Sequence, residues 1–332
     1  MTNNSTIHVD TLETTSSQNI EKPVMIDLSQ HYGLIQFSGE DASTFLQNQL
    51  TCDMREISEH QGSYGSYCTP KGRVLVNFLL FQYNNNYILQ LPINLCESLQ
   101  KRLSLYKLRA KVTIENVSHE YACIGLAGSH LSQALSRLFT SEPTLNQPLR
   151  FVDLNDHAFL CLANNRIQFI SPSTNTIAIW KYLHQQAQLV DIAYWNRLTI
   201  QAGIPVVLLE TQEKFLPQMI NLDAIGALSF KKGCYPGQEI VARTQYLGKL
   251  KRRMYLCHIT TTNTVNPGDL LYCADSADQS CGSVVNAVAS QSHDGYDALA
   301  VIQQSSVEAG EIHWGSLLGP VVQIKTLPYP LP

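Results

Sequence analysis

The sequence carries one pattern twice: LIQFSGEDASTFLQNQLT at Leu34–Thr51 aligns without gaps with CIGLAGSHLSQALSRLFT at Cys123–Thr140. In each copy an apolar run ends at a small residue and a glycine, and apolar residues at helical spacing follow. The two glycines, Gly39 and Gly128, fall at the same position of the alignment. The repeat predicts two related α+β units, each of which begins with a strand, a tight turn and an amphipathic helix.

The segments that follow each copy extend the two units. Arg73–Tyr83 and Tyr87–Leu91 flank three asparagines and predict a hairpin, and Leu95–Leu108 predicts a helix. Ala158–Ala163 and Arg166–Ser171 flank two asparagines and predict a second hairpin. Both units therefore contain antiparallel strands as well as helices, which indicates the α+β class.

The chain changes character near Gly248–Arg253. Beyond this point, short strand-like runs alternate with glycine, aspartate and serine turns, a texture typical of a small antiparallel β-barrel. The predicted strands of this part are Met254–Ile259, Asp269–Cys273, Gly282–Ala289, Ala298–Gln303 and Gly319–Ile324. We expect a separate C-terminal domain.

Composition excludes several classes of protein. The chain has 332 residues, of which 44% are hydrophobic, and no apolar run reaches the roughly 18 residues that a membrane-spanning helix needs. The first 20 or so residues are polar and lack a secretory pattern, so we expect a loose tail on a cytoplasmic protein without membrane contact. Nine cysteines without a Cys-x-x-Cys pair, and scattered histidines, argue against a disulfide scaffold and a metal site.

The charge is unevenly distributed. Lys and Arg number 23 and Asp and Glu number 27, for a formal net charge of −4. The segments Lys101–Lys111 and Lys231–Arg253 together carry +11, so the rest of the chain carries −15. The clusters predict a positive surface for an anionic ligand, and two solvated faces are the alternative.

The most unusual stretch is FKKGCYPGQEIVAR at Phe230–Arg243. Gly233 and Gly237 flank Cys234, which predicts a tight turn with exposed backbone. Pro236 suits the first position of a helix that runs through Gln238 to Thr244. Cys234 would then lie just before a helix N-terminus.

Two cations follow one another beside this cysteine. Lys231 and Lys232, together with the helix dipole, favour the thiolate of Cys234 over the thiol. We therefore expect Cys234 to be partly exposed and reactive, and the other eight cysteines to be buried and structural. The alternative is that Cys234 is also a buried structural cysteine.

Three segments carry a family resemblance: KGCYPGQE with the following VAR, AGIPV at Ala202–Val206, and FLPQMINLDAIGALSF at Phe215–Phe230. They closely resemble the bacterial YgfZ family of folate-binding proteins, which are linked to tRNA modification and iron–sulfur cluster maintenance. The resemblance runs from about Met25 to Tyr329, and extends more distantly to the aminomethyltransferase, or T-protein, of the glycine cleavage system. It implies a three-domain cloverleaf around a central folate-binding hole.

The resemblance also implies the domain boundaries. Two ferredoxin-like α+β units precede the C-terminal antiparallel β-barrel, and the first unit is discontinuous. We expect a disordered tail at 1–22, a folate-binding unit at 23–116 plus 190–247, a second unit at 117–189 and the barrel at 248–332.

Site residues carry over by position. Tyr32 and Trp195 occupy the places of folate-contacting aromatics, and aromatic faces suit the pterin and benzoyl rings. Gln201 stands where many relatives have a glutamate, so we expect weaker or altered contact with the pterin at this position. Tyr235 and Glu239 are also assigned to the cofactor, although simple helix capping is the alternative for Glu239.

The remaining motif residues are assigned to anion binding: Lys232, Gly233, Gly237, Gln238 and Arg243. Their ligand could be the glutamate tail of folate, RNA phosphates or only water.

Two residues distinguish the chain from true aminomethyltransferases. Val76 and Asn77 replace an acidic pair that the T-proteins carry near the reacting folate nitrogen. Neither side chain can act as an acid or a base at ordinary pH, so we expect no aminomethyltransferase activity.

The leading hypothesis is a tetrahydrofolate-binding accessory protein that supports iron–sulfur enzymes or assembly factors, including radical tRNA-modifying enzymes. Cys234 would be the essential thiol, and since a cluster normally needs four ligands, one cysteine would not hold a stable cluster alone. Folate-dependent one-carbon transfer or demethylation is the alternative from the enzyme class. Direct tRNA binding by the two basic segments is the alternative from the binding class.

Overall fold

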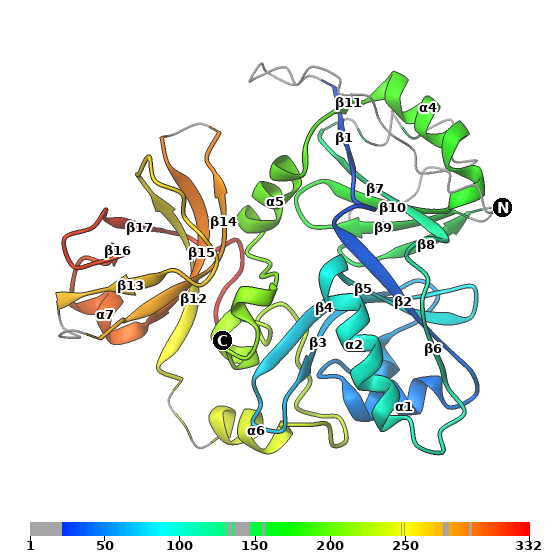
Figure 1. Cartoon of the computed structure of the whole chain (residues 1–332), viewed down its shortest axis with the longest axis horizontal. Helices are drawn as coiled ribbons and strands as arrows, with labels where there is room; N and C mark the ends of the chain where they lie inside the picture. The colour runs from blue at the N-terminus through cyan, green and yellow to red at the C-terminus, as the bar shows by residue number, and fades with distance from the viewer. Residues whose placement is uncertain are drawn as a thin grey trace.

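A computed structural model describes residues 22–129, 131, 135, 147–154, 157–246, 248, 250–274, 279–291 and 294–332. Three sheets surround a central helix: two α+β units are stacked on one side, and a curled sheet stands on the other (Figure 1). None of the helices in the described ranges is both long and apolar enough to span a bilayer. The predicted tail lies outside these ranges, apart from Lys22.

The first sheet has the strand order β3-β4-β5-β2-β6 and is antiparallel. Its strands are β2 (Tyr32–Ser38), β3 (Ser63–Cys68), β4 (Val74–Tyr83), β5 (Asn86–Pro92) and β6 (Thr113–Asn116). The helices α1 (Ala42–Gln49) and α2 (Ile93–Tyr106) bury apolar residues such as Leu46 and Leu99 in the same core as β2 and β4. Asn84 and Asn85 have φ of 49° and 60°, which closes the predicted hairpin with a left-handed turn.

The second sheet has the strand order β11-β1-β7-β10-β9-β8. Its strands are β1 (Val24–Asp27), β7 (Tyr121–Ala127), β8 (Phe151–Leu154), β9 (His157–Leu162), β10 (Arg166–Pro172) and β11 (Gln188–Leu189). The helix α4 (Thr176–Gln186) buries Ile179 and Leu183 in a core with the strands.

The strand β1 departs from the predicted division of the chain. Residues 24–27 were predicted to belong to the first unit, but β1 forms an antiparallel ladder with β7 and a parallel one with β11. A four-residue apolar strand has no internal signal for its partner, and here it fills the gap between two strands of the second sheet.

The two glycines of the repeat adopt similar conformations. Gly39 has φ of 106° and Gly128 has φ of 133°, a region that favours glycine, so both strands end in the predicted tight turn. The second helix of the repeat lies largely outside the described residues, but Leu131 and Leu135 are helical and buried.

After the second sheet the chain continues into a helix that contacts β1 of the second sheet and the strands β14 and β15. The helix α5 (Ile192–Gln201) begins at Asp191, whose side chain accepts a hydrogen bond from the Tyr194 amide, and it ends before Gly203 with φ of 68°. Two short 3-10 helices follow in this segment, η3 (Leu209–Thr211) and η4 (Pro217–Ile220). The helix α6 (Gln238–Tyr246) follows.

The third sheet is a curled antiparallel half-barrel with the order β16-β13-β14-β15-β12-β17. Its elements are β12 (Arg252–Ile259), β13 (Leu270–Tyr272), β14 (Gly282–Ala289), β15 (Tyr296–Gln303), α7 (Gln304–Ala309), β16 (His313–Trp314) and β17 (Val322–Lys325). Its own core is shared with no other unit, whereas a second apolar cluster joins Leu256 and Val285 of the half-barrel to Ile220 and Val74. The predicted α+β fold with a C-terminal antiparallel sheet is confirmed.

Candidate functional site

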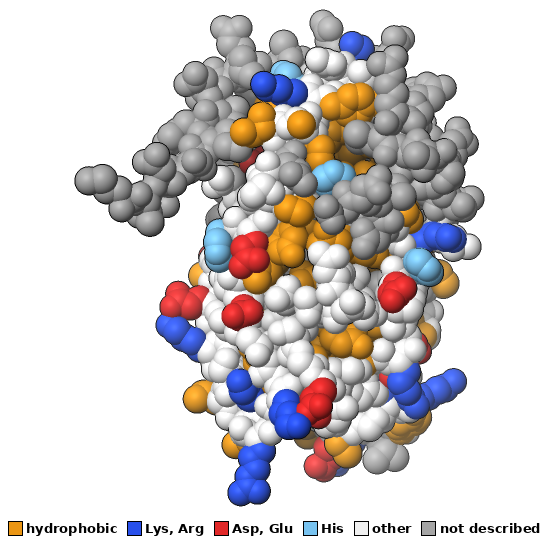
Figure 2. All heavy atoms as spheres, turned by 90° about the vertical axis from the view of Figure 1, so that its right-hand side faces the viewer, with side chains coloured by type: hydrophobic (Ala, Val, Ile, Leu, Met, Phe, Trp, Pro, Cys, Tyr) orange, Lys and Arg blue, Asp and Glu red, His pale blue; other side chains and the backbone are white. Residues whose placement is uncertain are grey.

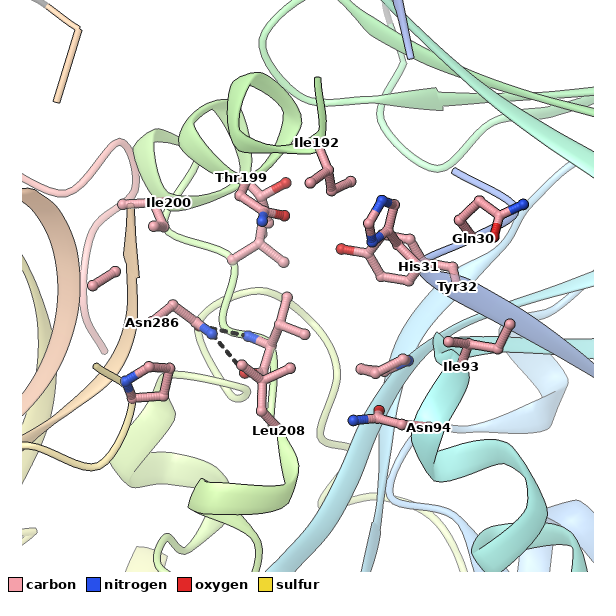
Figure 3. Close-up of a pocket in the computed structure, with 16 residues that line it drawn as sticks. Gln30, His31, Tyr32, Ile93, Asn94, Ile192, Thr199, Ile200, Leu208 and Asn286 are labelled. Carbon is pink, nitrogen blue, oxygen red and sulfur yellow. Dashed lines mark hydrogen bonds between the residues drawn. The ribbon is translucent and has the colours of Figure 1, made fainter. Parts of the chain in front are cut away.

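Two adjoining cavities lie where the three units meet. The large cavity has a volume of about 320 Å³ and is lined by the starts of β2 and α2, by α5 and the loop after it, and by β14. Figure 3 shows His31 and Tyr32 on one side of it, Thr199 and Ile192 of α5 above, and Asn286 of the half-barrel on the other side. The first unit, α5 with its following loop, and the half-barrel therefore each contribute a wall of the large cavity.

The second cavity, which we call the arginine cavity, has a volume of about 60 Å³. Its polar lining residues are Tyr32, Tyr64, Asn77, Gln90, Arg166, Gln168, Trp195 and Thr199. It shares Tyr32, Pro92, Thr199, Ile204 and Val206 with the large cavity, so the two adjoin. Among the residues that the structure describes, no aspartate or glutamate lines either cavity.

The two predicted folate-contacting aromatics come together here. Tyr32 lines both cavities, and burial raises its pKa to about 12. Trp195 is 3% exposed and lines the arginine cavity. The guanidinium of Arg166 lies 5.0 Å from the centroid of the Trp195 ring, a cation–π contact that already occupies part of the indole face.

Gln201 lies elsewhere. It is exposed at the end of α5 and lines neither cavity. Ile192, Asn196, Thr199 and Ile200 form the cavity face of this helix, and the next position is turned about 100° further around the axis. The structure therefore does not place Gln201 where the resemblance implies a pterin contact.

Cys234 is exposed, and the other eight cysteines are buried. This agrees with the predicted division between one accessible thiol and eight structural ones. Cys234 nevertheless lines neither of the two cavities. The thiol is therefore not part of the lining of either cavity.

The loop that carries Cys234 packs on the turn between β3 and β4. Gly237 has φ of 82°, and a Cβ at this residue would lie 2.4 Å from the carbonyl oxygen of Thr69 and 2.6 Å from the Cα of Gly72. A positive φ cannot continue a helix, so α6 begins at Gln238 and not at the predicted Pro236. Cys234 consequently lies one turn of irregular backbone away from the helix.

Lys232 is buried and points into the protein. Its ammonium donates hydrogen bonds to the carbonyl oxygens of Leu50 at 2.6 Å and Cys52 at 2.7 Å, and it lies 5.4 Å from the centroid of the Tyr235 ring. Burial lowers the pKa of Lys232 to about 8. This ammonium therefore holds the loop to the first unit. It is not available to an anion in solvent, which differs from the expectation drawn from the sequence.

The other residues of the motif differ in their exposure. Tyr235 is buried with no hydrogen-bond partner for its hydroxyl among the described residues, and burial raises its pKa. Gly233, Glu239 and Arg243 are exposed, and Gln238 is half-buried. None of these five residues lines a cavity, so the thiol loop and the cavities are two separate sites.

Asn77 has a clear structural role. Its amide donates to the carbonyl oxygen of Pro205 and accepts from the amide of Val207, both at 2.7 Å. Val76 beside it is buried in the core of the first unit. Asn77 therefore fastens the loop after α5 to β4, beside the arginine cavity.

Arg166 was missed as a site residue. The sequence offered a signal, because a lone arginine opens the apolar strand RIQFIS directly after a turn. Only the structure shows that its side chain turns inward, where it is 2% exposed.

Comparisons with known proteins agree with this architecture. The family model described as GCVT N-terminal domain matches residues 11–171. The tRNA-modifying protein YgfZ of Colwellia psychrerythraea is 34% identical over 247 residues, which cover 73% of this chain and 75% of that protein. The protein of the same name from Klebsiella pneumoniae is 28% identical over 316 residues, 95% of this chain and 96% of the relative.

Among solved structures, the glycine cleavage system aminomethyltransferase T of Bartonella henselae has a TM-score of 0.73 and 15% sequence identity, over 92% of this chain and 86% of that one. At this identity the likeness concerns the fold. The Colwellia psychrerythraea relative, with 34% identity over 73% of this chain and 75% of its own length, shows the family. The chain belongs to the YgfZ family.

Proposed function

We propose that this chain is a folate-binding accessory protein that supports iron–sulfur cluster assembly or repair, and thereby tRNA modification, with Cys234 as its essential thiol. The observation that carries the proposal is the exposure of Cys234 alone among nine cysteines, within the glycine-bracketed loop of the family motif. The name of the relatives, tRNA-modifying protein, supports the last part of the proposal.

The cavities support the folate part. The large cavity reaches the lower end of the range typical of small-molecule sites, and most of its lining is apolar, as stacked rings require. Tyr32 lines both cavities, and Trp195 lines the arginine cavity beside it. A T-protein-like fold and the GCVT family model point to the same ligand class.

Folate binding is tested by titration with tetrahydrofolate while tryptophan fluorescence is recorded. We expect a saturable change that disappears in Trp195→Phe and persists in Trp314→Phe, whose indole lies in the half-barrel. Because Cys234 lines neither cavity, Cys234→Ala should bind with unchanged affinity. A wild-type protein that shows no saturable binding by fluorescence or calorimetry would overturn the folate part.

The thiol part is tested in a deletion strain. We expect Cys234→Ala and Cys234→Ser to fail to restore the activity of iron–sulfur enzymes, whereas Cys161→Ala, a matched change at a buried cysteine, should restore it. Both kinds of variant must be present at wild-type levels by immunoblot. Full rescue by Cys234→Ala would remove the essential thiol from the proposal.

The proposed partner is an iron–sulfur enzyme or assembly factor and not tRNA itself. Within the two basic segments, Lys232 is buried, Arg253 forms a buried ion pair with Asp223, and Lys101 and Lys111 form ion pairs with Glu97 and Glu40. Figure 2 shows basic and acidic side chains interspersed on the face of the molecule that it draws. Lys249 lies outside the described residues.

This choice of partner predicts weak RNA binding. Charge reversal at Lys251 and Arg252 should leave any tRNA affinity nearly unchanged, since under this proposal their positive charges do not contact phosphate. A steep salt dependence of tRNA binding that these substitutions abolish would favour direct recognition instead.

A further inference from the structure

The arginine cavity holds a buried cation without a counter-ion. Arg166 is 2% exposed, its Nε donates to the carbonyl oxygen of Ala163 at 3.1 Å, and one Nη donates to the hydroxyl of Thr199 at 2.7 Å. No carboxylate in the described part of the chain forms an ion pair with it. A guanidinium carries five N–H groups, so several remain for another acceptor.

Two further donors face the same cavity. Gln90 of β5 is 5% exposed and Gln168 of β10 is 3% exposed, and both line the arginine cavity. The Nε2 atom of each is buried and has no hydrogen-bond partner among the described residues. Arg166 and Gln168 are two residues apart on one strand, so they project to the same face.

The side chains around these donors are closely packed. Gly125 of β7 leaves room for Trp195, since a Cβ there would lie 2.8 Å from the indole ring. The indole in turn lies beside the guanidinium of Arg166. A buried charge without a counter-ion and two unpaired amides are costly in a folded protein, and such groups call for a physical explanation.

We propose that Arg166, Gln90 and Gln168 form a subsite that binds a ligand oxygen with full or partial negative charge. The proposal rests on the proposed folate function and deepens it. In folate, this chemistry is present in the 4-oxo group of the pterin and in the glutamate carboxylates. With about 60 Å³ against about 320 Å³, the arginine cavity takes one end of the ligand and the large cavity takes the rest.

The test compares wild type, Arg166→Met and Gln168→Leu by isothermal titration calorimetry with three probes. The probes are tetrahydrofolate, tetrahydrobiopterin, which lacks the benzoylglutamate, and p-aminobenzoylglutamate, which lacks the pterin. We expect Arg166→Met to weaken tetrahydrofolate binding by about ten-fold to one-hundred-fold, the effect of losing one charge-assisted hydrogen bond. Arg109→Met, at an exposed arginine away from both cavities, should bind as wild type does.

The two partial probes identify the oxygen. A loss confined to tetrahydrobiopterin assigns the subsite to the pterin 4-oxo group, and a loss confined to p-aminobenzoylglutamate assigns it to a carboxylate. Urea unfolding without ligand separates binding from folding, because replacing an uncompensated buried charge by an apolar side chain should leave the midpoint unchanged or raise it.

The proposed subsite is overturned if Arg166→Met binds tetrahydrofolate as tightly as wild type does. The proposed folate function is not affected by that result. The subsite is also overturned if Arg166→Met lowers the urea midpoint and keeps its affinity, because Arg166 would then be structural. If the wild-type protein binds none of the three probes, both proposals are overturned together.

Discussion

Lys232 is a cation of the family motif, and its ammonium has a structural role. It joins the loop before α6 to the carbonyl oxygens of Leu50 and Cys52, which follow α1 more than 170 residues earlier. Its neighbour Lys231 is exposed. Sequence alone treats the two lysines as equivalent charges, because nothing in the order of residues tells which of two adjacent side chains turns inward.

Replacing Lys232 by methionine should destabilise the protein by about 1–3 kcal/mol, since two buried carbonyl oxygens lose their donor. The measurement is urea unfolding, with Lys231→Met as the matched control, for which a change within about 0.5 kcal/mol is expected at an exposed site. Equal effects of the two substitutions would show that the hydrogen bonds of Lys232 to Leu50 and Cys52 contribute nothing to the free energy of unfolding.

The stabilities of wild type and Lys232→Met should also depend differently on pH. In the folded state Lys232 loses its proton near pH 8, whereas in the unfolded chain it keeps the proton up to its ordinary pKa of 10.5. The unfolded state then binds more protons between these values, so this group makes the free energy of unfolding rise with pH across that window. The difference in stability between wild type and Lys232→Met should therefore grow from pH 8 to 10, and a difference that shrinks would contradict the burial of the charged amine.

Cys234 illustrates a residue that the sequence placed well. Its polar, glycine-rich surroundings indicated exposure, and the other eight cysteines are buried as predicted. Brief treatment of the native protein with iodoacetamide should modify Cys234 first, as peptide mass spectrometry would record. Cys234→Ser should show no fast phase, and fast labelling of any buried cysteine would mean that the fold opens more readily than its packing implies.

At the scale of elements, the start of α6 depends on Gly237. The pattern predicted the helix itself, but proline and glycine are both common at helix starts, so the first residue was open to error. The positive φ of Gly237 and its approach to Thr69 and Gly72 are contacts across the fold that no local pattern carries.

Gly237→Ala should therefore destabilise the protein by about 1–3 kcal/mol or more, from the left-handed φ and the collision of a Cβ with backbone atoms. Gly233 offers a matched control in the same loop, since nothing lies within 4 Å of a Cβ there and its φ is not positive. Urea midpoints of the two alanine variants give the comparison. Similar losses in both would mean that the loop tolerates neither and that the packing of Gly237 is not special.

Strand β1 marks the limit of prediction for short elements. Longer segments such as β4 and α2 were predicted within a few residues, because each carries many periodic positions. The four residues of β1 carry too few, and their partners β7 and β11 lie about 100 and 160 residues further along the chain. Local periodicity therefore predicted the longer elements, but it did not predict the strands with which β1 pairs.

At the scale of the whole molecule, the cavities exist only because three units meet. Tyr32, Arg166, Trp195 and Asn286 come from β2, β10, α5 and β14, so the lining joins every unit of the fold. The resemblance supplied the aromatics and the idea of a central hole. The inward turn of Arg166 and the separation of Cys234 from the cavity depend on how the units pack, and neither could be derived from the order of residues.

One residue fastens the half-barrel to the cavity wall. Asn286 accepts a hydrogen bond from the amide of Val206 and donates one to its carbonyl oxygen, both at 2.8 Å, as the dashed lines in Figure 3 show. The amide side chain thus continues β14 onto the loop after α5 as a strand neighbour would. Both residues line the large cavity, so the fit of the half-barrel and the shape of the ligand site are set by the same contact.

Asn286→Ala should leave both backbone groups of Val206 without a partner, at a cost of about 1–3 kcal/mol in unfolding free energy. We also expect faster amide hydrogen exchange at Val206 and weaker tetrahydrofolate binding, because the wall of the cavity is no longer held. Asn266→Ala, at an exposed turn of the half-barrel, should change none of the three. If exchange at Val206 stays at the wild-type rate while binding weakens, Asn286 contacts the ligand directly and does not act by positioning the half-barrel.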